Sequence, residues 1–256
     1  MKRRDFLKAS GAGIASTAAV SLSGLTLLAP IAVYAATVNV NKTAEGAYKT
    51  LVDGTSVYVW QFNDVNGSGP GALTSGLIVR EGDIVNVTVK NNLDRTIRFN
   101  IAGVSMSTNS VSSGDSHTYS FTAPPAGSYM FTDNYNGELG RAMGLSGPMV
   151  VMPANGSNTL YSGGPDFDRQ YTLFMSELDD RLNAAVEAGG SFDMNDYEPN
   201  YFFANGLSYP DTTADADTLI SMNVGEDVAI RFINGGAITY PMHFHGYHVN
   251  VATRNR

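Results

Sequence analysis

Three of the four histidines in this 256-residue chain lie within the C-terminal segment 240–248. His243 and His245 are two residues apart, and in an extended strand that spacing sends both side chains to one face while Phe244 points to the other. Two neutral imidazoles that converge from one strand can bind a transition metal such as copper or zinc. The spacing therefore makes His243 and His245 candidate metal ligands.

The same pair has a second interpretation, in which the imidazoles are simply hydrogen-bonded inside a core. One strand supplies too few ligands for a complete metal site, so further ligands must come from elsewhere. His248 has the opposite parity and joins the pair only where Gly246 bends or bulges the strand, so its role stays open. His117, in a separate strand-like run, is expected to be an ordinary histidine with a local partner.

Residues 1–35 are expected to be an export signal that precedes the folded protein. A short basic run is followed by an apolar stretch rich in Ala, Gly and Ser, and Val33-Tyr34-Ala35 offers a small-residue cleavage site. The run Arg3-Arg4-Asp5-Phe6-Leu7-Lys8 resembles a twin-arginine signal, which implies export to the periplasm or otherwise out of the cytoplasm. An N-terminal membrane anchor is the alternative, and the glycines and the cleavable triplet speak against it.

Charge and cysteine content exclude several classes of function. Residues 1–35 carry four basic side chains against one acidic, so the net charge of −8 for the full sequence becomes −11 for the remainder. An acidic protein of this kind is not expected to bind nucleic acid or anionic lipid. The chain has no cysteine, so it forms no disulfide and supplies no thiolate for a type-1 copper centre.

The residue pattern of the chain after the signal is that of an all-β protein. Short β-branched or aromatic runs are separated by Gly, Asn, Asp and Ser, a pattern typical of sandwiches and barrels. One helix is expected, over 178–188, with Gly189-Gly190 to end it. The predicted strands cover residues 56–62, 76–79, 84–89, 96–99, 117–121, 128–131, 149–152 and 171–175.

An internal repeat supports two copies of one sandwich. Residues 81–103 align without a gap with residues 224–246, at a constant offset of 143. The offset pairs Gly with Gly at 82 and 225, Val with Val at 85 and 228, and Asn with Asn at 91 and 234. A gapless match that keeps the strand alternation favours a duplicated unit. Under the same offset, Asn100 and Ala102 stand where His243 and His245 stand.

Several motifs resemble the multicopper oxidase family of cupredoxin-domain proteins across nearly all of the predicted mature region. The segment 241–246 resembles that family's His-Pro-x-His-x-His-Gly copper motif. The segments 127–134 and 144–151 resemble the end of its first domain, and 171–175, 201–206 and 210–212 resemble the opening of a later one. The resemblance implies tandem cupredoxin-like Greek-key β-sandwiches and a copper cofactor. We expect domain 1 at 36–154, a linker at 155–170 and domain 2 at 171–256.

The resemblance also implies which copper ligands this chain keeps. His243 and His245 match the two histidines that ligate the family's trinuclear copper cluster, whereas Tyr240 replaces the preceding type-1 copper ligand. The cysteine motif is absent. The four histidines expected from the first domain are replaced by Asn100, Ala102, Thr132 and Asn134.

The second sandwich is expected to be incomplete at its C-terminus. The counterpart of Val151 would be residue 294, beyond the last residue, Arg256. An open sandwich exposes strand edges and apolar core, which native proteins avoid. The sequence therefore predicts either a fragment, the preferred interpretation, or a chain completed by a homo-oligomer or another strand-supplying partner.

Three functions remain open from the sequence. The first is an exported copper-binding protein that uses His243 and His245 and is not a competent oxidase on these residues alone. The second is a fragment of a copper-dependent oxidoreductase whose remaining ligands lie elsewhere. The third is a degenerate cupredoxin with a structural or interaction role.

Overall fold

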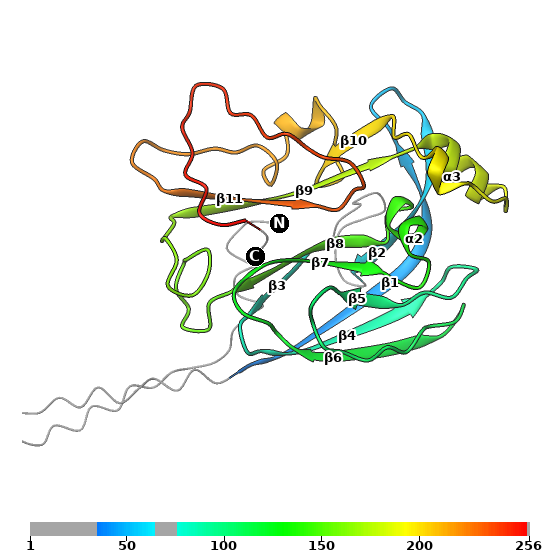
Figure 1. The fold of residues 1–256 in the computed structure, drawn as a ribbon, viewed down its shortest axis with the longest axis horizontal. Helices are drawn as coiled ribbons and strands as arrows, with labels where there is room; N and C mark the ends of the chain where they lie inside the picture. Colours follow the sequence, from blue (N-terminus) through cyan, green and yellow to red (C-terminus); the bar gives the residue numbers. More distant parts are fainter. Residues whose placement is uncertain (1–34, 65–75, 255–256) are drawn as a thin grey trace, which may run out of the picture. The chain divides into compact units, whose positions relative to one another are not determined.

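The computed structural model describes residues 35–64 and 76–254, so nearly all of the predicted export signal lies outside the described residues (Figure 1). Apart from short helices, the described chain consists of β-strands and their connections. The strands are β1 (Thr37–Thr50), β2 (Ser56–Asp64), β3 (Leu77–Arg80), β4 (Ile84–Asn91), β5 (Phe99–Ile101), β6 (Ser116–Thr122), β7 (Gly127–Asp133), β8 (Ser146–Met152), β9 (Arg169–Leu178), β10 (Tyr201–Ala204) and β11 (Val228–Asn234). The helices are α2 (Glu138–Ala142), α3 (Asp180–Glu187) and the 3-10 turns Met194–Asp196 and Asp211–Thr213.

Two four-stranded sheets form the first sandwich, in the orders β2-β1-β4-β6 and β3-β8-β7-β5. Strand β4 shows why they pack together: Val85, Val87 and Val89 are fully buried in the core between the sheets, while the residues between them face outward. The strand predicted at 96–99 is found instead at Phe99–Ile101, as β5. Ile97 instead forms an isolated bridge with Val111.

The second half repeats the first sheet in order and in direction. Strands β10-β9-β11 correspond to β2-β1-β4, because each central strand pairs antiparallel with one neighbour and parallel with the other. Val85 and Val228, which the sequence repeat aligns, hold equivalent places in the two sheets: Val85 lies opposite Val38 of β1, and Val228 lies opposite Arg169 of β9. The described part of the second half thus contains a copy of the first sheet without a counterpart of β6.

Strand β8 is buried on both faces. Met149 and Val151 lie in the core of the first sandwich, whereas Val150 and Met152 pack in a separate cluster with Ala229 of β11. Strands β9 and β11 lie alongside β8 and β7 in Figure 1, and β9 contacts β8 while β11 contacts β7. The outer face of the first sandwich therefore forms a second apolar layer with the second sheet.

Polar contacts join the two halves as well. Asn183 of α3 donates to the carbonyl of Tyr58 at 2.7 Å, and Leu182 and Val186 of the same helix belong to the core of the first sandwich. Arg231 of β11 is buried, and it donates to Ser128 Oγ at 3.2 Å, to Gln170 Oε1 and to the Leu160 carbonyl. Burial lowers the pKa of the Arg231 guanidinium. Through Leu182 and Val186, helix α3 packs in the first core although it follows β9 in sequence.

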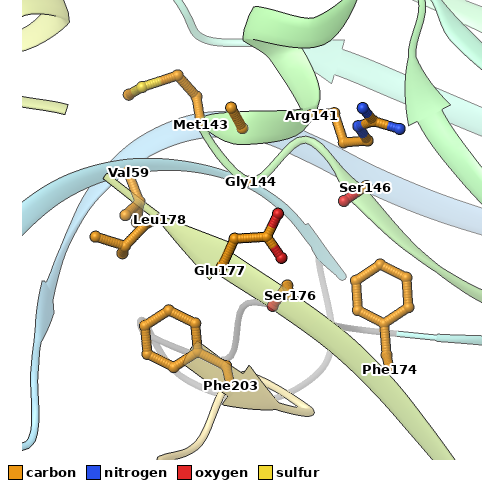
Figure 2. Close-up of a pocket in the computed structure, with 11 residues that line it drawn as sticks. Val59, Arg141, Met143, Gly144, Ser146, Phe174, Ser176, Glu177, Leu178 and Phe203 are labelled. Carbon is orange, nitrogen blue, oxygen red and sulfur yellow. The ribbon is translucent and has the colours of Figure 1, made fainter. Parts of the chain in front are cut away.

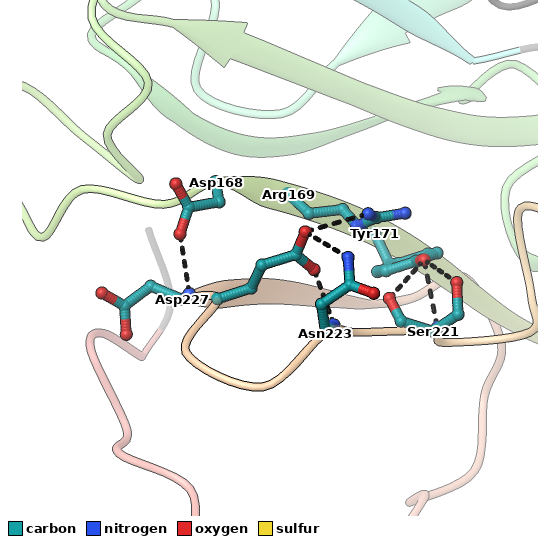
Figure 3. Close-up of polar contacts among 7 residues, drawn as sticks. Asp168, Arg169, Tyr171, Ser221, Asn223 and Asp227 are labelled. Atoms are coloured by element: carbon teal, nitrogen blue, oxygen red, sulfur yellow. Dashed lines mark hydrogen bonds and ion pairs between the residues drawn. The ribbon is translucent and has the colours of Figure 1, made fainter.

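A polar cluster fastens the turn before β11 to the start of β9 (Figure 3). Glu226 accepts from the backbone and side-chain nitrogens of Asn223 and from Arg169 Nη2 at 3.2 Å. These donors lower the pKa of the Glu226 carboxyl to about 2, with the Asn223 backbone contributing most. Next to them, the Tyr171 hydroxyl and Ser221 bond each other at 3.0 Å. The cluster fixes the register between the two parallel strands.

No helix within residues 35–64 and 76–254 combines the length and the apolar character needed to cross a membrane. The twin-arginine run and most of the predicted cleavage site lie outside this part of the chain. The limits of the predicted domains and linker stay predictions.

Candidate metal centre

The two candidate ligands lie in an irregular segment that follows β11. His243 and His245 are both exposed, and neither belongs to a strand. Their rings nevertheless lie next to each other, with centroids 4.6 Å apart and planes at 85°. In the first copy the equivalent residues lie in and just after β5, which pairs with β7. Segment 242–244 has no ladder partner among the described residues and forms no strand.

Phe244 lies between the two histidines in sequence, and its side chain points to the sheet. Its ring packs against Phe232 of β11, with centroids 6.1 Å apart. Phe232 occupies the position of Val89, a core residue of the first sandwich, so Phe244 sits on the surface that is the core face in the first copy. The alternation expected of a strand is thus kept although no strand forms, and both imidazoles are directed away from the apolar layer.

The other histidines do not join the pair. His117 Nε2 lies 3.1 Å from Ser107 Oγ, and its ring packs edge-on against Tyr119, as expected of a histidine with a local partner. Gly246 adopts φ of +78°, so the chain bends before the exposed His248. Within the described residues no three His, Cys, Asp or Glu side chains are grouped so that they could hold a metal ion.

An asparagine turn connects β11 to this segment, and it repeats a turn of the first copy. Asn234 Oδ1 accepts from Gly236 N at 2.8 Å, and its Nδ2 donates to the Ile238 carbonyl at 2.8 Å. Asn91 makes the same two bonds, to Leu93 N at 3.0 Å and to the Arg95 carbonyl at 2.7 Å. The sequence repeat therefore extends to individual side-chain hydrogen bonds.

A buried carboxylate lies beneath this turn. Glu177 of β9 is 6% exposed and accepts from the backbone nitrogens of Ala237 and Ile238 and from the Tyr240 hydroxyl. Burial, and then the hydrogen bond to Glu177, raise the pKa of the Tyr240 hydroxyl well above its usual range. The sequence does not predict this contact, because nothing local indicates which way the Glu177 side chain points.

A small cavity is lined in part by Glu177 (Figure 2). The rest of its lining comes from β9 and β10 of the second half and, in the first, from Val59 of β2, the end of α2 with Arg141, and the chain from there to Ser146 of β8. About 20 Å³ is open to a water molecule, which is room for roughly one. Neither His243 nor His245 lines it, so the cavity is separate from the imidazole pair.

The corresponding positions of the first copy carry no imidazole. Asn100 of β5 lies directly opposite Thr132 of β7, so two of the four substituted positions are brought together. Ala102 and Asn134 follow in the connections after these strands and are exposed. The backbone of a two-strand site is therefore present in the first copy, but amide and hydroxyl oxygens are poor copper ligands compared with imidazole.

The donor set at residues 243 and 245 suits copper. Neutral imidazole is a ligand that copper prefers, and the two rings are adjacent and exposed, as an ion entering from solvent requires. Two imidazoles make a partial site, which water or another chain must complete. These residues fit an open site at which water or another chain supplies the remaining ligands. They do not fit a site in which the two histidines supply every ligand.

Comparisons with known proteins bear on the family and the fold. The model of the multicopper oxidase family matches residues 45–156. A putative laccase from Oryza sativa subsp. japonica is 26% identical over 191 residues, which cover 66% of this chain and 32% of the relative. The chain thus spans about a third of the length of that curated relative.

Two solved structures share the fold. The multicopper oxidase mgLAC superposes with a TM-score of 0.64 at 23% identity, covering 82% of this chain and 65% of the other. A blue copper oxidase from Nitrosomonas europaea superposes with a TM-score of 0.62 at 22% identity, covering 78% and 61%. Residues 45–156 are thus similar to the multicopper oxidase family, and the fold of the described chain is all-β and cupredoxin-like.

Proposed function

We propose that this protein is an exported copper-binding protein of multicopper-oxidase-like fold, and that it holds copper through His243 and His245. The observation that carries the proposal is the adjacency of the two exposed rings, 4.6 Å apart, in the copy that kept its histidines. Copper is the cofactor characteristic of the family whose model matches residues 45–156. Bound copper supplies one-electron redox chemistry.

Each part of the segment has a defined task in this proposal. His243 and His245 present imidazole nitrogens on one side of the chain. Phe244 anchors the segment by packing on Phe232, which turns the imidazoles outward. The remaining coordination positions stay open to water or to ligands from another chain.

The first experiment measures copper in the protein purified from the periplasm. Wild-type protein is expected to carry near-stoichiometric copper, and the double variant His243→Ala/His245→Ala is expected to lose it while keeping its β-rich circular dichroism. His117→Ala is the matched control, because it removes the same side chain from a position bonded to Ser107. Copper retention in the double variant contradicts the proposal and favours the structural or interaction role.

A second candidate is a copper-dependent oxidoreductase activity that needs further ligands. The family match favours it, whereas the positions of Asn100, Ala102, Thr132 and Asn134 and the absence of cysteine oppose turnover by this chain alone. Oxygen uptake by the copper-loaded protein with a phenolic electron donor separates the two. We expect no uptake above that of the double variant, and reproducible uptake that depends on His243 supports the oxidoreductase.

Export and assembly are part of the proposal and are tested separately. Replacing Arg3 and Arg4 by lysine is expected to keep the protein in the cytoplasm, which cell fractionation measures. Strand β11 is an edge strand of its sheet within the described residues, and a second chain or further residues that add a strand to it would pair this edge as β6 pairs that of β4. Analytical ultracentrifugation of the purified chain reports the association.

A further inference from the structure

The contact between Glu177 and the turn after β11 buries a carboxylate, which costs free energy unless hydrogen bonds compensate. A carboxylate that is 6% exposed loses most of its hydration, and burial is tolerated only when hydrogen-bond donors replace the water. Here the donors are two backbone N–H groups, of Ala237 and Ile238, and the Tyr240 hydroxyl. All three belong to the four residues that lie directly before Pro241 and the imidazole pair.

This contact exists in only one of the two copies. Ala44 lies opposite Asn91 in the first sheet and Met175 lies opposite Asn234 in the second, so Gly46 of β1 is the counterpart of Glu177. The counterpart of Tyr240 is Ile97, which is fully buried among apolar residues. The copy without imidazoles thus has neither the carboxylate nor the hydroxyl, although the asparagine turn between them is the same.

The turn is also shaped to admit the carboxylate. A Cβ on Gly236 would lie 1.7 Å from Glu177 Oε2, and a Cβ on Gly235 would lie 2.0 Å from the Phe174 ring. The first copy has Asn92 and Leu93 at these positions. Only the second copy therefore leaves room beside its turn for a side chain of the central strand to bind the turn's backbone.

The Glu177 contact fixes where the histidine segment starts. Asn234 holds the turn from one side through Gly236 and Ile238, and Glu177 holds it from the sheet. Tyr240 is the last anchored residue, and only Pro241 and Met242 separate it from His243. Since proline fixes φ, little freedom remains between the anchor and the first imidazole.

We propose that Glu177 and Tyr240 are positioning residues of the copper site, which hold the chain entering His243 and His245 in the conformation that brings the two rings together. This inference rests on the proposed function. Groups that orient metal ligands without touching the metal commonly change affinity by about 10- to 100-fold when they are removed. Glu177 acts through the backbone of the turn and is not itself a ligand.

The test compares two tyrosine variants in the full-length protein. Tyr240→Phe removes only the hydroxyl that binds Glu177, and Tyr48→Phe is the matched control, because the Tyr48 hydroxyl makes an exposed bond to Glu187 of α3. Competition titration with Cu²⁺ is expected to give an affinity about tenfold weaker for Tyr240→Phe and unchanged for Tyr48→Phe. The electron paramagnetic resonance spectrum of bound Cu²⁺ is expected to broaden or split in Tyr240→Phe only.

A copper-free measurement tests the contact by itself. Amide hydrogen exchange at Ala237 and Ile238 is expected to accelerate in Tyr240→Phe and in the isosteric Glu177→Gln, while exchange in β4 and β8 stays the same. Unchanged exchange overturns the contact. Faster exchange with unchanged copper affinity and spectrum overturns the positioning role. Absence of copper from the wild-type protein overturns the proposed function instead, and it is seen before any variant is measured.

Discussion

Single residues determine how the second copy differs from the first. Asn91 and Asn234 make the same turn, yet the residues two and six positions further along differ, with Leu93 and Ile97 in one copy and Gly236 and Tyr240 in the other. Gly236 leaves room where Leu93 fills a core, and Tyr240 supplies a hydroxyl where Ile97 is apolar. Together these two changes allow a carboxylate to bind this turn. Local substitutions within a conserved backbone are thus sufficient to change the chemistry.

Glu226 gives a prediction at this scale, because its carboxyl pKa is lowered from 4.5 to about 2. A carboxylate with a depressed folded-state pKa stabilises the folded protein above its unfolded-state pKa, and this stabilisation is lost as the pH falls through the folded-state value. We expect the difference in unfolding free energy between wild type and Glu226→Gln to be constant above about pH 5, to shrink below pH 4.5 and to vanish near pH 2.

Urea unfolding at a series of pH values measures this difference. The result applies to the cluster of Arg169, Asn223 and Glu226, since these groups supply the donors. A difference that does not vary between pH 7 and pH 3 would show that the cluster does not lower the pKa.

At the scale of elements, β8 is the strand on which both halves depend. Its side chains alternate between two apolar clusters, so every residue of the strand is buried. In an antiparallel sandwich one face of a strand commonly meets solvent. Here the second sheet covers that face, which is why Val150 and Met152 are as apolar as Met149 and Val151.

A matched pair of substitutions tests the second cluster. Val150→Ala and Val151→Ala remove the same two methyl groups from opposite faces of one strand, and the two side chains are 3% and 0% exposed. Each is expected to lower the unfolding free energy by about 2 kcal/mol, from lost burial and the cavity that remains. Urea titrations of both variants provide the comparison. A loss well under half as large for Val150→Ala would mean that the second sheet is loosely packed on β8.

At the scale of the whole described chain, the halves share their cores. Leu182 and Val186 of α3 lie in the first core although the helix follows β9, and Ala229 of β11 packs with Val150 of β8. The buried Arg231 adds a hydrogen bond to Ser128 of the first half. Neither half can lose its structure without exposing apolar surface of the other.

We therefore expect the described region to unfold in one cooperative transition. Differential scanning calorimetry should give a calorimetric enthalpy close to the van't Hoff enthalpy. An Arg231→Ala variant, which removes a group that bonds both halves, is expected to lower the transition temperature without splitting the peak. Two separated transitions in the wild-type protein would contradict shared cores.

The sequence alone determined the strand pattern, the repeat and the pairing of the two imidazoles. These features depend on alternation and spacing, which are local properties of a chain. The alternation around Phe244 survives even though segment 243–245 forms no strand. Strand β1 and helix α2 were missed, because the mixed polarity of the first and the short length of the second give little local signal.

Only the tertiary structure decided which face of β11 is buried and what Glu177 binds. In the first copy Val85, Val87 and Val89 face the core, whereas in the second the alternate residues Ala229, Arg231 and Ile233 are buried, because that face meets β7 and β8. Burial depends on which surfaces meet, and residues 177 and 240 are 63 positions apart. Contacts of such sequence separation are set by packing, so no local pattern indicates them.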